Sequence, residues 1–140
     1  MRRTVYLALL VACAAVSIFG SVTLAEGQRT SYMSMAIPGF ESQNWWDNHI
    51  DAWSTDVTFE NCTDHYRPTI PVNATIELWY VRDWLPDVSK GLRTLNCYNA
   101  FSTGSWGEMT DVGNYHFLLK YINGWESDYW LDVEHVYMSW

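Results

Sequence analysis

The sequence predicts an all-β protein, a small antiparallel β-sandwich of six to eight strands with an immunoglobulin-like or jelly-roll-like arrangement. Apolar and polar residues alternate over several segments, which is typical of half-buried strands. Turn residues separate these segments about every 8–12 residues, the spacing of a sandwich. No segment shows a sustained helical period with capping residues. A small eight-stranded β-barrel is the alternative.

The strand patterns differ in strength along the chain. Residues 30–36 and 52–59 give weak patterns, and the irregular segment 42–50 between them is expected to form a loop or a single helical turn. Residues 76–81 alternate clearly, and residues 92–98 do so weakly.

The last two strand patterns are the clearest. Residues 114–121 alternate throughout. In residues 131–138, alternation places His135 and Tyr137 on the same face as Leu131 and Val133. The chain therefore ends on a strand, which predicts that Trp140 is packed.

Turn chemistry falls between the strand patterns. Pro86-Asp87 occupies one gap, and Gly104 and Gly107 place residues 104–107 in a predicted hairpin. Asn123-Gly124 ends the strand pattern of residues 114–121 with a type I′ hairpin signal.

The N-terminus has the features of a secretory signal peptide. Arg2 and Arg3 precede an uncharged run that ends in small residues before Glu26. This pattern predicts that residues 1–25 are a signal peptide, that residues 26–140 are a single sandwich domain, and that the protein is secreted.

Two other interpretations of this segment are open. Residues 5–25 are long enough to span a bilayer as an uncleaved anchor. Residues 10–13 read like a lipobox ending in Cys13, but the apolar run continues beyond that cysteine, whereas a lipidated cysteine is normally followed by a polar tether. Cleavage near Ala25 is therefore favoured.

The two remaining cysteines, Cys62 and Cys97, predict one disulfide, because exported chains with an even cysteine count usually pair them. Closing this 36-residue segment is expected to contribute roughly 3–4 kcal/mol to stability. Asn61 and Asn73 begin N-glycosylation sequons; they are surface sites if the source is eukaryotic and chance matches if it is bacterial.

The charge balance excludes some partners. The chain has 8 Lys and Arg against 16 Asp and Glu, a net charge of −8. This argues against nucleic acid and anionic membranes, which attract basic residues. The high aromatic content argues against disorder.

Several motifs resemble a known group of proteins. They are Ser105-Trp106, the run 113–117 with its Gly-x-Tyr-x-Phe pattern, the closing strand that ends in Ser139-Trp140, and the upstream Cys97. This pattern resembles small secreted β-sandwich proteins of Gram-positive bacteria, over about the last 70 residues. The resemblance implies the fold and export, and it carries no catalytic residues to transfer.

Nine tryptophans are the most unusual feature of the composition. Trp79, Trp106 and Trp140 are expected in the core. Exposed indoles on a rigid β scaffold form platforms for sugar rings or anchors for a protein partner. The candidate ligand contacts are the tryptophans in predicted loops, namely Trp45, Trp46, Trp84 and Trp125.

Two acidic groups resemble metal-binding patterns. They are Asp47-x-His49-x-Asp51 and a group made of Asp128, Asp132, Glu134 and His135. Neither matches a defined metal-binding loop, so a solvated acidic face is the favoured interpretation, and no metal or cofactor is expected.

Catalytic motifs are scarce. Residues 104–107 do not form the G-x-S-x-G elbow, and the sequence has no phosphate-binding glycine loop. The leading hypothesis is therefore a secreted, non-catalytic domain that binds extracellular or envelope polysaccharide, or a protein. A small secreted toxin or bacteriocin-like effector is the first alternative, and a secreted hydrolase, without residue evidence, is the second. The oligomeric state is left open.

Overall fold

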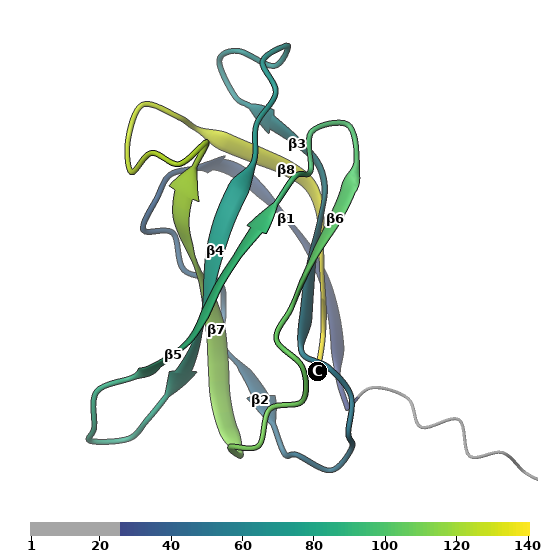
Figure 1. The fold of residues 1–140 in the computed structure, drawn as a ribbon, viewed down its shortest axis with the longest axis vertical. Coiled ribbons are helices and arrows are strands. Elements are labelled where there is room, and N and C mark those ends of the chain that lie inside the picture. Colours follow the sequence, from purple (N-terminus) through teal and green to yellow (C-terminus); the bar gives the residue numbers. More distant parts are fainter. Residues whose placement is uncertain (1–25) are drawn as a thin grey trace, which may run out of the picture.

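The computed structural model describes residues 26–140, which form eight β-strands (Figure 1). The strands are β1 (Gln28–Ala36), β2 (Trp45–Asp47), β3 (Asp56–Asp64), β4 (Ala74–Val81), β5 (Val88–Leu95), β6 (Phe101–Ser105), β7 (Gly113–Ile122) and β8 (Leu131–Ser139). Within this part of the chain, no helix has the length and hydropathy needed to cross a membrane. The predicted signal peptide, the anchor alternative and Cys13 lie outside the described residues.

The strands form two four-stranded antiparallel sheets that pack as a sandwich. Sheet A has the order β1-β8-β3-β6, and sheet B has the order β2-β7-β4-β5. Antiparallel pairs join β1 to β8, β2 to β7, β3 to β6 and β4 to β5, so the pairing is nested along the chain. This is the connectivity of a jelly roll. The predicted sandwich is confirmed, and the barrel alternative is wrong because each sheet keeps two edge strands.

The core lies between the inner faces of the two sheets. Phe59 of sheet A meets Phe117 of sheet B edge to face, with ring centroids 5.7 Å apart. Around this pair, the inward positions of β4 and β7 supply fully buried aliphatic residues such as Ile76, Leu78 and Leu119. Such alternating inward positions are what holds a sandwich together.

The irregular segment 42–50 contains the short strand β2. Pairing of β2 with β7 turns Trp45 inward, where it is only 2% exposed. Its indole lies 5.7 Å from the ring of Trp140 and 6.4 Å from that of Tyr115. The expectation that Trp45 lies in a loop as a ligand contact is therefore wrong, because its indole fills the core.

Sheet A departs from simple alternation in its two central strands. In β8, Glu134 and His135 follow each other on the outer side, between the buried Val133 and Val136. The paired strand β3 also has two consecutive outward residues, at positions 60 and 61, between buried residues. The prediction that His135 and Tyr137 share the face of Leu131 and Val133 is therefore wrong.

Strand β6 occupies a segment for which the sequence predicts a turn because of its glycine. A Cβ at Gly104 would lie 2.8 Å from the Cβ of Arg93, so glycine is needed where β6 approaches β5. Nε of Arg93 also donates to the carbonyl of Ser105 (2.6 Å), and Nε1 of Trp106 donates to the carbonyl of Gly91 (2.9 Å). These contacts close the β5–β6 side of the sandwich.

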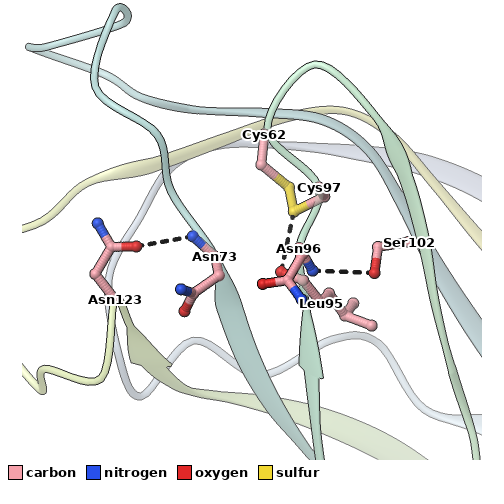
Figure 2. The surroundings of a disulfide bond; sticks show 7 residues. All are labelled: Cys62, Asn73, Leu95, Asn96, Cys97, Ser102 and Asn123. Carbon is pink, nitrogen blue, oxygen red and sulfur yellow. Dashed lines mark hydrogen bonds between the residues drawn. A yellow bond between two sulfur atoms is a disulfide. The ribbon is translucent and has the colours of Figure 1, made fainter.

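The predicted disulfide between Cys62 and Cys97 is present (Figure 2). It joins the middle of β3 to the segment after β5, with the two Cα atoms 5.1 Å apart and both residues fully buried. The N–H of Cys62 also donates to the carbonyl of Cys97 (2.8 Å). Beside it, the N–H of Asn96 donates to Oγ of Ser102 (3.0 Å).

The predicted Asn123-Gly124 turn is also present. Both residues have positive φ (51° and 80°), and Ile122 and Trp125 exchange two backbone hydrogen bonds. However, the chain then crosses to sheet A instead of pairing back on β7, so the turn does not make a hairpin.

Candidate ligand-binding face

The outer face of sheet A carries aromatic side chains on three of its four strands. Register places His135 beside Glu60, and Glu60 beside Phe101, in one row across β8, β3 and β6. Tyr137 lies in the next row, and Tyr32 projects from β1. We call these five residues the aromatic face.

The rings of the aromatic face are accessible to solvent. Tyr32 is 73% exposed, Phe101 65% and Tyr137 36%. Single exposed aromatics are common, but several exposed rings on one face of a sheet form a surface that a ligand can cover.

Glu60 fixes the centre of the aromatic face. Its Oε2 accepts a hydrogen bond from the hydroxyl of Tyr137 (2.9 Å) and another from Nδ1 of His135 (3.0 Å). The two rings stack at 5.8 Å with an interplanar angle of 29°. The hydrogen bond to Glu60 raises the pKa of Tyr137, because it is made by the protonated phenol. These contacts hold both rings in place.

A polar hollow adjoins the aromatic face. Its volume is about 610 Å³, and seven of its nine lining residues carry polar side chains. The lining residues are Tyr32, Met33, Ser34, Asn61, Thr63, Asn99, Asp132, Val133 and Glu134.

Two carboxylates are held in the polar hollow. Oε2 of Glu134 accepts from Nδ2 of Asn61 (2.6 Å). Asp132 accepts from the N–H of Met35 (2.8 Å) and from Nδ1 of His65 (2.7 Å). Partial burial works to raise the pKa of Asp132, but these two partners outweigh it and lower that pKa. Asp132 is therefore ionised at neutral pH.

The outer face of sheet A is negatively charged. Strands β3, β6 and β8 contain no lysine or arginine and five carboxylates, of which four lie on the outer side and one, Asp64, is buried and paired with Arg67. The arginine of β1, Arg29, lines an adjoining cleft of about 310 Å³ between β1 and residues 40–43, which shares Tyr32 and Met33 with the polar hollow. The floor of that cleft is made of core side chains such as Phe117 and Val136, which expose little surface. We therefore favour the polar hollow as the place where a ligand contacts the domain.

The tryptophans predicted to bind a ligand do not gather. Trp46 is 52% exposed on β2, Trp84 is fully exposed at the tip of the β4–β5 hairpin, and Trp125 is 63% exposed in the β7–β8 connection. Figure 1 shows this hairpin and this connection at opposite ends of the sandwich. Contact of these three residues with a ligand stays a prediction. Trp106 and Trp140 pack against the core as expected. The expectation that Trp79 lies in the core is wrong, because it alternates with the inward Ile76 and Leu78 and is half-buried on the outer side of β4.

Sequence reasoning missed the aromatic face. As single aromatics, Tyr32 and Phe101 give no signal in the sequence, and regular alternation of β8 puts Tyr137 on the wrong side. Of the two sequons, Asn61 lies in the polar hollow, and Asn73 lies just before β4.

The acidic groups considered for metal binding serve other purposes. Asp47 and Asp51 accept the backbone N–H groups of His49 (2.8 Å) and Trp53 (2.9 Å), which shapes their loop. Across residues 26–140, no three His, Cys, Asp or Glu side chains are placed to hold a metal ion.

Comparison with family models, curated proteins and solved structures finds no match to this chain.

Proposed function

We propose that this chain is a secreted, non-catalytic binding domain that recognises extracellular or envelope polysaccharide through the aromatic face of sheet A. The observation that carries this proposal is the set of exposed rings on one sheet face around a fixed carboxylate. A pyranose ring offers both an apolar C–H face and a rim of hydroxyl groups. Aromatic rings stack on the first, and carboxylate or amide oxygens accept hydrogen bonds from the second.

The dimensions of the face favour a chain of sugars over a single sugar. Four strands spaced about 4.8 Å apart span about 14 Å from β1 to β6. Tyr32 lies on one edge strand and Phe101 on the other, with Tyr137 between them. A polysaccharide laid across the strands can therefore contact several rings at once.

Affinity gel electrophoresis tests the proposal. Native protein is run through gels that contain hydroxyethylcellulose, laminarin, mannan or dextran, and retardation is measured against polymer concentration. We expect at least one polymer to retard the protein. Tyr32→Ala and Phe101→Ala are each expected to weaken this binding about tenfold, which corresponds to about 1.4 kcal/mol.

Trp84→Ala is the matched control, because it removes a fully exposed aromatic ring away from the aromatic face. It should leave retardation unchanged. If Trp84→Ala weakens binding and the two face variants do not, the hairpin tip is the site and the aromatic face is rejected. Absence of retardation by every polymer would reject polysaccharide binding.

Secretion is tested separately by the intact mass of the extracellular protein, with and without reductant. We expect the mass of residues 26–140 less two hydrogens, and a gain of two on reduction. Retention of residues 1–25 in a membrane fraction would support the anchor. Additional hexose mass would show that a sequon is used.

A further inference from the structure

We infer that the polar hollow is a subsite for an uncharged sugar unit, and that Glu134 excludes sugar units that carry carboxylate or sulfate groups. This inference rests on the proposed function and specifies the ligand class of the same surface. It concerns selectivity, whereas the aromatic face accounts for affinity.

The walls of the hollow suit an uncharged, hydroxyl-rich ligand. Tyr32 supplies an exposed ring at one side, and the amides of Asn61 and Asn99 supply donors and acceptors. Ser34 and Thr63 add hydroxyl groups. Each of these groups can exchange hydrogen bonds with sugar hydroxyls without changing its charge.

Glu134 is the carboxylate best placed to meet the ligand. Among the described contacts, one of its oxygens is engaged by Asn61, while the side chain is exposed on the outer face. Both oxygens of Asp132 are already engaged, by Met35 and His65. Asp132 therefore contributes negative charge to the hollow, and Glu134 contributes negative charge together with a free acceptor.

Among residues 26–140, no lysine or arginine lines the polar hollow, because Arg29 of β1, the one lysine or arginine on the strands of sheet A, directs its guanidinium to Gln43 and Asn44. The strands β3, β6 and β8 carry no lysine or arginine, and His65 and His135 are each paired with a carboxylate. An anionic sugar unit in the hollow would therefore face like charge with no counter-charge. Such juxtaposition lowers the affinity for the wrong ligand and in this way produces specificity.

Glycosylation of Asn61 would determine whether the polar hollow is accessible to a ligand. Nδ2 of Asn61 is the atom that N-glycosylation modifies, and the same atom donates to Glu134. A glycan attached there would fill the hollow. The test therefore uses protein that is made in a bacterial host and has the mass of an unmodified chain.

The experiment compares polymers that share a backbone and differ in charge. Hydroxyethylcellulose is paired with carboxymethylcellulose, and dextran is paired with dextran sulfate, in affinity gels at low and high salt. The uncharged member of a pair should bind at least tenfold more tightly at low salt. High salt should reduce this difference, because it screens exposed charges.

Glu134→Gln should raise the ratio of the affinity for the anionic polymer to that for the uncharged polymer at least threefold, because it removes the negative charge of this side chain. The variant should fold normally, because the hydrogen bond that Glu134 accepts from Asn61 can also be accepted by a glutamine oxygen. Asp83→Asn, in the exposed β4–β5 hairpin, removes the same charge away from the hollow and should change neither affinity.

The outcomes separate the two proposals. Equal binding of charged and uncharged polymers, or an effect of Asp83→Asn as large as that of Glu134→Gln, would overturn the selectivity while the binding function stands. Binding of no uncharged polymer would overturn both.

Discussion

Removal of the Cys62–Cys97 disulfide should lower the free energy of unfolding by about 4 kcal/mol in the chain-entropy model. The bridge has a sequence separation of 35, so it closes a loop of moderate length in the unfolded chain. Both cysteines are fully buried, so the double variant Cys62→Ala, Cys97→Ala also loses the packing of two sulfur atoms. Residues 26–140 have an unfolding entropy of about 240 cal/mol/K near 60 °C, so this loss corresponds to a fall in Tm of about 17 °C.

Thermal unfolding followed by circular dichroism measures this effect. The wild-type protein is compared with the double variant, and with itself in the presence of reductant. Ser102→Ala is a matched control, because it removes only the hydrogen bond from Asn96 in the same connection and should lower Tm by about 4 °C. A decrease in Tm smaller than about 5 °C in the double variant would refute the reasoning. It would mean that the unfolded chain already restricts the 62–97 segment without the bridge.

Three further changes test other parts of the fold. Gly104→Ala should cost about 1–3 kcal/mol, because its new methyl group meets Arg93, and chemical denaturation measures the loss. Phe59→Ala should cost about 3–5 kcal/mol by opening a cavity in the core, which the same denaturation measures. Burial works to raise the pKa of Asp64, but its hydrogen bonds and ion pair with Arg67 (3.1 Å) lower that pKa on balance. This stabilisation is present above the unfolded pKa of about 3.9 and is lost as pH falls through the lower folded value. Denaturation between pH 2 and 7 should therefore show a smaller acid loss in Asp64→Asn than in the wild type, and equal losses would contradict this role.

The parts of the fold that could be predicted are those with local causes. Alternation predicts β4, β7 and β8, and the even cysteine count after the predicted signal peptide predicts the disulfide. Strand β6 could not be predicted in this way. Its Gly104 looks like a turn residue, but the reason for it is the approach of Arg93 from another strand, which local sequence does not reveal.

The candidate site was less predictable than the fold. Strict alternation assigns Tyr137 to the core, and only the double outward step at Glu134 and His135 moves it to the surface. That step is matched by Glu60 and Asn61 on the neighbouring strand, so it depends on pairing between segments that lie far apart in the sequence. A search for exposed aromatics in loops could not find a site on a sheet face.

The aromatic face and the Trp84 hairpin tip differ in how far their side chains are already immobilised before a ligand binds. Trp84 is fully exposed at a hairpin tip, so binding there would have to immobilise a free side chain. Tyr137 is already held by its hydrogen bond to Glu60 and by stacking against His135. Immobilising a side chain costs about 0.5–1.5 kcal/mol, and a preordered ring avoids most of this cost. For rings of similar size, the aromatic face should therefore yield more affinity per contact than the hairpin tip, which is the physical reason to place the ligand on sheet A.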